Sequence, residues 1–153
     1  MTGAVAIDLD SALGDTRPLW NDWLASASEL FGVYANALPA DRGEAAAELD
    51  DRGGGNWRVL LERFAEDRAA VYVRRDAQTG AALRALAAAG REIGVFTDAP
   101  EPLARVALAQ LGVVGPLVAL EAGSGALERL LARLGPETVV VRCRAELLEQ
   151  AAA

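Results

Sequence analysis

The feature that most constrains the fold is a regular alternation of short apolar runs with amphipathic segments in the second half of the chain. The apolar runs are predicted strands and the segments between them predicted helices, in the order 93–96, 100–111, 117–120, 127–134, 139–141 and 145–152. Gly112 and Gly135 follow two of these helices, where glycine commonly ends a helix. Strands that alternate with helices form a parallel sheet with right-handed crossovers. The sequence therefore predicts an α/β fold.

The first half of the chain opens with one further predicted strand. Residues 3–8 are a short apolar run that ends in an acid, which is typical of a buried strand. Beyond it, Asp15 or Thr16 is suited to cap a helix, and Pro18 fits its first turn. Apolar residues then recur at spacings of three and four, which predicts one buried helical stripe made of Trp20, Trp23, Leu24, Ala27, Leu30, Phe31 and Tyr34.

The stretch from residue 35 to residue 90 is also predicted to be helical, with interruptions. Pro39 is expected to open a short helix, and a helix over 78–89 is expected to end at Gly90. The glycines at 53–55 favour a linker, although three glycines before a helix can also cradle an anion. Asn56 is suited to cap the next helix. That helix has a predicted apolar stripe of Trp57, Leu60, Leu61, Phe64, Val71 and Tyr72.

Two missing residue types exclude several kinds of chemistry. The 153 residues include no His, and all 15 basic residues are Arg. Without His there is no Ser-His-Asp triad and no His-ligated metal, and without Lys there is no Schiff base and no Walker lysine. The single Cys143 excludes an internal disulfide. Proton transfer and metal binding are therefore expected to fall to carboxylates.

The net charge of −7 argues against nucleic acid as a partner, because an acidic surface repels phosphate backbones. The sequence shows neither a signal-peptide pattern nor an apolar run of about 18 residues, so we expect no membrane association. A lone cysteine fits a reducing compartment. We expect a cytoplasmic protein.

Polar side chains follow two of the predicted strands. Asp8 and Asp10 come at the end of the first strand, and Thr97 and Asp98 at the end of the second. The carboxyl ends of parallel strands are where such sheets bind ligands, so we expect these four side chains to share one crevice. Alternation along a strand predicts that both aspartates point the same way. One of them can act as a nucleophile or metal ligand while the other transfers protons. Alternatively, both aspartates simply cap loop amides.

Two motifs resemble those of the haloacid-dehalogenase-like (HAD) hydrolases. The segment Asp-Leu-Asp-Ser-Ala-Leu at 8–13 resembles the first motif of that family, and Ile-Gly-Val-Phe-Thr-Asp at 93–98 resembles the second. The resemblance spans nearly the whole chain. It implies a Rossmann-like, three-layer parallel sheet formed by residues 1–15 and 80–153. It also implies a small helical cap, residues 16–79, inserted after the first strand.

The resemblance also implies a role for each residue. In that family the residue matching Asp8 attacks a phosphoryl group and forms an aspartyl-phosphate. The residue matching Asp10 protonates the leaving oxygen and later activates water. Thr97, with Asp98 beside it, is then expected to bind the phosphoryl oxygens. Mg²⁺ would be held by the Asp8 carboxylate and the Asp10 backbone carbonyl.

The chain departs from the family pattern in its third and fourth motifs. The stretch 121–126 supplies no Lys, and Cys143 stands where a metal-binding Asp is expected. Arg142 and Arg144, at the end of the fourth predicted strand, are candidates to supply the missing positive charge, because Arg binds phosphate well. Because the metal-binding Asp is missing, magnesium binding is expected to be weak or absent. Removing one charge-stabilising group typically lowers a rate about 10²–10³-fold, so catalysis is expected to be inefficient.

These observations lead to two hypotheses. The first is a degenerate HAD-like protein without efficient catalysis, which binds a small phosphorylated molecule or a protein partner. The alternative is a weak, magnesium-dependent phosphomonoester hydrolase that acts through Asp8. We also expect a homodimer if the helical cap exposes Trp20, Trp23 and Trp57, since a second copy would cover such a surface.

Overall fold

Four short parallel strands form the centre of the protein. The computed structural model describes residues 3–31, 37–52 and 55–153. The sheet has the order β3-β2-β1-β4, and its strands are β1 (Val5–Asp8), β2 (Ile93–Thr97), β3 (Ala119–Ala122) and β4 (Val139–Val141). Every neighbouring pair is parallel, with Asp8 of β1 in register with Phe96 of β2. The predicted α/β class with a parallel sheet is therefore confirmed.

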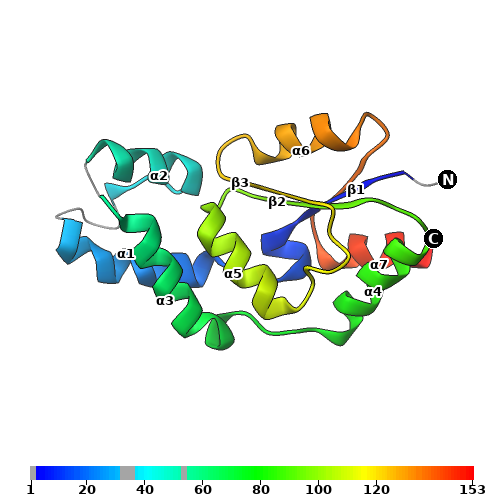
Figure 1. Ribbon diagram of the computed structural model, residues 1–153, viewed down its shortest axis with the longest axis horizontal. Helices are drawn as coiled ribbons and strands as arrows, with labels where there is room; N and C mark the ends of the chain where they lie inside the picture. The colour runs from blue at the N-terminus through cyan, green and yellow to red at the C-terminus, as the bar shows by residue number, and fades with distance from the viewer. Residues whose placement is uncertain (1–2, 32–36, 53–54) are drawn as a thin grey trace.

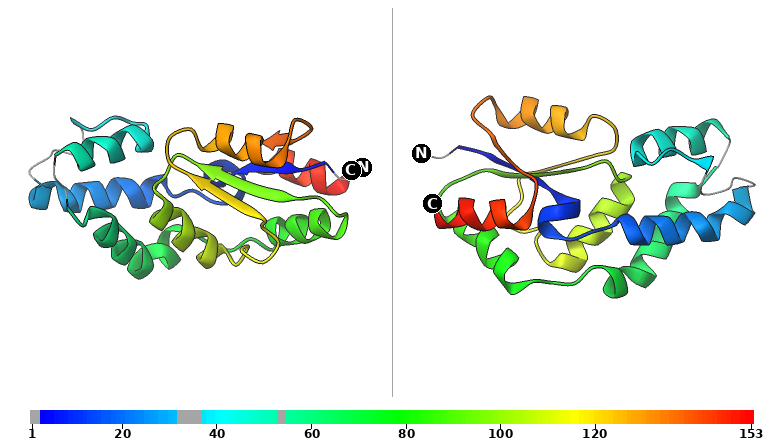
Figure 2. Two further views of the ribbon diagram at one scale, coloured as in Figure 1. Left: turned by 45° about the horizontal axis from the view of Figure 1, so that its top comes forward. Right: turned by 180° about the vertical axis from the view of Figure 1, so that it is seen from behind.

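Helices cover both faces of this sheet (Figures 1 and 2). One face carries α6 (Ala126–Leu134), whose Leu130 packs on Ala6 and Phe96. The other face carries α4 (Ala77–Ala88), α5 (Glu101–Leu111) and α7 (Arg144–Ala152), which enclose Ile7 and Val95. The result is three layers, helix–sheet–helix, compatible with the Rossmann-like arrangement. Because both faces are covered, the strands are mostly continuous apolar runs rather than alternating ones, with Asp8 and Thr97 at strand ends and Glu121 within β3 as the polar residues.

Three helices form a separate layer of packing at the end of the molecule opposite the C-terminus (Figure 1). They are α1 (Arg17–Phe31), α2 (Arg42–Asp51) and α3 (Trp57–Tyr72), called here the α1–α3 unit. This unit has its own apolar cluster, which Leu103 of α5 joins to the rest of the protein. The expected domain boundary at residue 79 falls inside α4, since α4 begins at Ala77 and packs against α7.

The three tryptophans lie at the centre of the α1–α3 unit. Trp20, Trp23 and Trp57 are each at most 3% exposed, with ring centroids 5.3–6.4 Å apart. They pack against one another and against small residues such as Ala45, so they offer no apolar surface to a second copy. The condition under which we expected a homodimer is therefore not met.

Several predicted boundaries and stripes need correction. The second helix begins at Arg42 rather than Pro39, because the Asp41 side chain accepts the Glu44 N–H and fixes the first turn there. On α3, Leu60 and Val71 are exposed, at 38% and 70%. The buried stripe of α3 instead follows a spacing of four residues and consists of Trp57, Leu61, Ala65 and Ala69.

The third strand begins at Ala119 rather than at residue 117. A turn closes between Val114 and Leu117, and the strand continues through Glu121, whose carboxylate pairs with Arg129 and Arg133 of α6. Asn56 precedes α3 as expected, but its side chain makes no capping hydrogen bond. The expectations for Tyr34, Gly53, Gly54 and the side chains of Leu30 and Phe31 lie outside the described residues.

Gly94 is predicted to be essential for the close approach of α6 to the sheet. A Cβ atom at this position of β2 would lie 2.6 Å from Leu130 and 3.0 Å from Leu134. We expect Gly94→Ala to lower the free energy of unfolding by about 1–3 kcal/mol, because a filled core must then shift. Urea denaturation measures this change. Gly115→Ala is the matched control, since a Cβ there meets nothing within 4 Å; equal stability losses for both variants would contradict the prediction.

Candidate functional site

A buried arginine occupies the carboxyl edge of the sheet. Arg42, the first residue of α2, is only 2% exposed. Its guanidinium forms an ion pair with Asp10 and another, at 2.8 Å, with Asp98. The Arg42 backbone N–H also donates to Asp98, at 3.0 Å. Arg42 therefore ties the α1–α3 unit to the ends of β1 and β2 through charge.

The carboxylate of Asp10 has no capacity left for other partners. One oxygen accepts both the N–H, at 2.9 Å, and the hydroxyl of Thr16. The other oxygen accepts the Thr97 hydroxyl, at 2.7 Å, and the Arg42 guanidinium. An ionised carboxylate offers about four acceptor positions, and all four are used here.

The hydroxyl of Thr97 also has all of its hydrogen-bonding positions occupied. Its hydroxyl donates to Asp10 and accepts hydrogen bonds from the Ala99 N–H, at 3.1 Å, and from Arg42, at 3.3 Å. One donor and two acceptor positions exhaust a hydroxyl. Among the described residues, no buried side-chain nitrogen or oxygen lacks a hydrogen-bond partner. This network is therefore complete without a ligand.

Asp8 and Asp10 do not point the same way, contrary to the alternation expected along a strand. β1 ends at Asp8, and residues 9–13 form a single π-helical turn, which removes the period of two. Asp8 instead accepts the Asp10 N–H, at 3.1 Å, as the first residue of a capped turn. The alternative that these aspartates bind loop amides is thus met for Asp8 and, through the Thr16 N–H, for Asp10.

The two carboxylates also differ in acidity. Burial raises the pKa of Asp8 above its ordinary value of 3.8, the Asp10 N–H lowers it, and the charge of Asp10 raises it again, with a net increase. Burial also opposes ionisation of Asp10, but Arg42, Thr16 and Thr97 outweigh it, so the pKa of Asp10 lies below 3.8. Asp10 is therefore held as a carboxylate, which cannot donate a proton to a leaving group.

A cavity of about 260 Å³ lies next to this network, and Asp8 lines it. Thr97 and Asp98 at the end of β2 contribute to its wall, and so does Asp41 at the start of α2. The turn at 123–125 and the first turn of α6 line it as well. Of the expected site residues, Asp8, Thr97, Asp98 and Arg142 line this cavity, whereas Asp10 does not.

The structure separates the two arginines at the end of β4. Arg142 lines the cavity with its guanidinium 5.8 Å from the ring of Phe96, and its charge lowers the pKa of Asp8. Arg142 makes no ion pair with any described residue. Arg144 pairs with Asp76 at 2.5 Å and does not line the cavity. Cys143 is half-buried at the start of α7.

The donors at this site do not fit the magnesium ion implied by the resemblance. The backbone carbonyl of Asp10, one of the two expected ligands, accepts a hydrogen bond from the Arg17 guanidinium at 3.3 Å. Both oxygens of Asp98 bind Arg42. Within the part of the chain that the structure describes, no group of three Asp, Glu or Cys residues could hold a metal ion. Of the two expected ligands, only the Asp8 carboxylate is left, which is the lower limit of the one or two carboxylates that usually hold Mg²⁺.

Sequence reasoning missed Arg42, although a signal was present. A cation in the first turn of a helix opposes the helix dipole, so it is unfavourable unless carboxylates compensate it. Arg42 follows the capping residue Asp41 directly and sits at this unfavourable position. In a chain whose arginines number 15, however, nothing in the sequence alone marks this one as buried.

Comparison with known proteins adds no family. No model of a protein family matches the chain, and no curated protein matches it significantly. Within the described ranges, no helix is long and apolar enough to cross a membrane.

We predict that Arg42 is the most important charged residue for stability. Arg42→Met should lower the free energy of unfolding at neutral pH by about 3–5 kcal/mol, because it leaves a buried, unpaired carboxylate. Since Asp10 has a lowered pKa in the fold, its stabilising contribution is present above the ordinary Asp pKa and is lost as pH falls through the lowered value. The difference between wild type and variant should therefore shrink in acid.

Urea denaturation at neutral pH and in acid checks this prediction. Arg52→Met removes an exposed pair with Glu48 and serves as the control, with an expected change of less than about 1 kcal/mol. A loss for Arg42→Met no larger than that of the control would show that the buried pair is not important for stability.

Ionised Asp8 is predicted to destabilise the fold, whereas ionised Asp10 stabilises it. Its pKa is raised in the folded state, so the ionised form destabilises the fold as pH rises above the ordinary Asp pKa. Asp8→Asn should therefore raise the free energy of unfolding at neutral pH by at most about 1 kcal/mol, and with it the melting temperature. In strong acid, where Asp8 is protonated, the substitution should have no such effect. Thermal unfolding at neutral pH and in strong acid measures these two effects. A variant less stable than wild type at neutral pH would show that ionised Asp8 does not destabilise the fold.

Proposed function

We propose that this protein is a degenerate HAD-like protein that binds a small phosphorylated molecule at the ends of its strands without hydrolysing it. The α1–α3 unit would then be the helical cap, inserted between β1 and α4. The order of elements supports this proposal, since the two motif segments at 8–13 and 93–98 end neighbouring strands and the helices lie between them.

The observation that carries the proposal is the saturation of Asp10 and Thr97 by Arg42 and Thr16. A hydrolase of this type needs an acid/base group and a free hydroxyl donor for the phosphoryl oxygens. Here the carboxylate is fixed in its ionised form, and the hydroxyl donates inward to it. The positive charge expected from a Lys comes instead from Arg42, but that charge is directed at the protein's own carboxylates.

The cavity lining favours a ligand with two different ends. Arg142 and the backbone N–H groups at the start of α6 can hold an anionic group, because Arg and helix N-termini both bind phosphate. Asp8 and Asp41 each accept one backbone N–H in the fold and keep acceptor capacity toward the cavity. A phosphorylated molecule with hydroxyl or ammonium groups would satisfy both ends. A volume of about 260 Å³ suits a small metabolite.

The absence of catalysis is tested with a generic phosphomonoester, p-nitrophenyl phosphate. We expect wild type and Asp8→Asn to release product at the same background rate, with and without Mg²⁺. Calorimetric titration with Mg²⁺ should show no binding. Hydrolysis by wild type that Asp8→Asn abolishes would overturn the proposal and favour the phosphatase alternative.

Ligand binding is tested by thermal shift with a panel of phosphorylated polyols and amines. A ligand at 100 times its dissociation constant should stabilise the fold by about 2.7 kcal/mol. Arg142→Gln should abolish the shift, whereas Arg144→Gln should keep it, because Arg144 lies outside the cavity. No shift across the panel, or equal loss in both variants, would reject this part of the proposal.

A further inference from the structure

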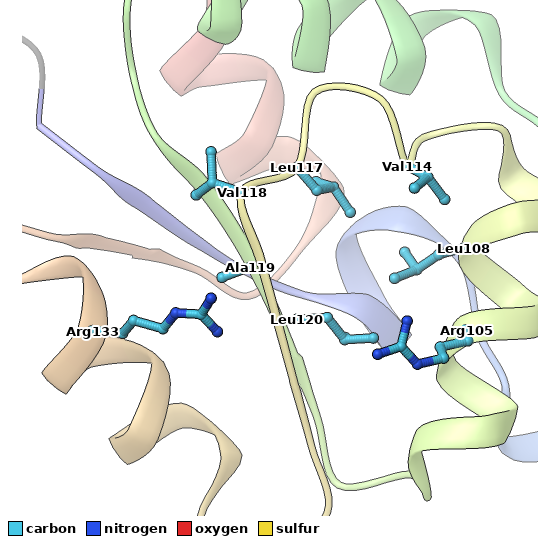
Figure 3. Close-up of a pocket in the computed structure, with 8 residues that line it drawn as sticks. All are labelled: Arg105, Leu108, Val114, Leu117, Val118, Ala119, Leu120 and Arg133. Atoms are coloured by element: carbon cyan, nitrogen blue, oxygen red, sulfur yellow. The ribbon is translucent and has the colours of Figure 1, made fainter.

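The outer edge of β3 forms the floor of a groove that shares no lining residue with the strand-end cavity. β3 is the first strand in the sheet order, and no described strand pairs with its outer side. A depression of about 320 Å³ runs along this edge between α5 and α6 (Figure 3). An edge strand presents unpaired backbone N–H and C=O groups, so it is a template for another extended chain.

The groove is apolar on its floor and basic on its walls. Leu117 and Leu120 line it beside Leu108 of α5. Arg105 of α5 and Arg133 of α6 project from the two sides of β3, as Figure 3 shows. No acidic residue is among the residues that line the groove. On the α5 face the groove offers Leu108, Leu117 and Leu120, and on the α6 face it offers Arg133. Because alternate side chains of a strand point to opposite faces, an extended occupant with apolar side chains that alternate with acidic ones is complementary to both.

Both arginines are available to such an occupant. Their side chains are exposed, at 68% for Arg105 and 55% for Arg133. Each currently pairs with a glutamate of this chain, Glu101 at 2.6 Å and Glu121 at 3.2 Å. Exposed pairs of this kind contribute little to stability, so the arginines can exchange partners at small cost.

Two exposed valines lie at the rim of the groove, beside an edge strand that lacks the usual protective residues. Val114 and Val118 are 54% and 52% exposed and lie beside the edge of β3. Natural edge strands commonly carry charged or proline residues that prevent pairing with other chains. β3 instead pairs its one acidic residue, Glu121, with Arg129 and Arg133 and leaves the valines at the edge.

We propose that the β3 edge is a docking site for an extended segment of another protein in which acidic and apolar side chains alternate. The segment would add a fifth strand next to β3. Its backbone would pair with β3, its apolar side chains would cover Leu117 and Leu120 on the α5 face, and its acids would face Arg133 on the α6 face. Recognition by strand addition uses this combination of main-chain bonds and alternate side chains.

The test uses a blocked, fluorescein-labelled peptide in which glutamate and valine alternate. We expect saturable binding with a dissociation constant below about 1 mM, and weaker binding at high salt. Nuclear magnetic resonance should show shifts and slower amide exchange at residues 114–122. A peptide with lysine in place of glutamate should bind at least about tenfold more weakly.

Matched double variants locate the charges. Arg105→Gln with Arg133→Gln should weaken binding about three- to tenfold. Arg63→Gln with Arg84→Gln removes the same charge from exposed positions on α3 and α4, and should leave binding unchanged.

Several results would overturn the proposal. They are no binding up to about 1 mM, equal binding of the lysine peptide, resonance shifts confined to the Asp8 cavity, and equal weakening by both double variants. Concentration-dependent dimerisation of the free chain through residues 114–122 would also overturn it, because a second copy would then be the occupant.

Discussion

The arrangement of this protein depends on one buried guanidinium. Arg42 reaches from α2 to the ends of two strands that lie far from it in the sequence, and it neutralises Asp10 and Asp98 there. An isolated buried charge is very unfavourable, so each partner requires the other. The same contact that holds the α1–α3 unit against the sheet also removes Asp10 and Thr97 from any role toward a ligand. The same network therefore both stabilises the fold and fixes these two side chains.

Much of the fold could be predicted because local patterns decide it. The runs at 93–96 and 139–141 are continuous and apolar, and Gly112 and Gly135 end α5 and α6 as expected. The errors have physical causes. β3 extends through Glu121 because arginines of α6 neutralise it, and α3 buries alanines because a close approach to other helices needs small residues.

The candidate site could be predicted only in part. Neighbouring parallel strands do bring Asp8 and Thr97 to one cavity, as the position of their residues at the strand ends implies. Asp8 lines the cavity and Asp10 does not, because a π-helical turn follows Asp8 and because Asp10 pairs with Arg42, 32 residues further along the chain. No local pattern encodes such a long-range contact, and the identity of the buried cation therefore had to come from the tertiary structure.

The first turn of α2 combines three roles in consecutive residues. Asp41 lines the cavity, Arg42 enters the buried network, and Gly43 packs so closely on Ser124 that a side chain at 43 would overlap its backbone. Successive residues of a helix are rotated by about 100° around its axis. A single-residue insertion inside this first turn would therefore rotate the residues after it by about 100° relative to those before it, and the three contacts could no longer form together.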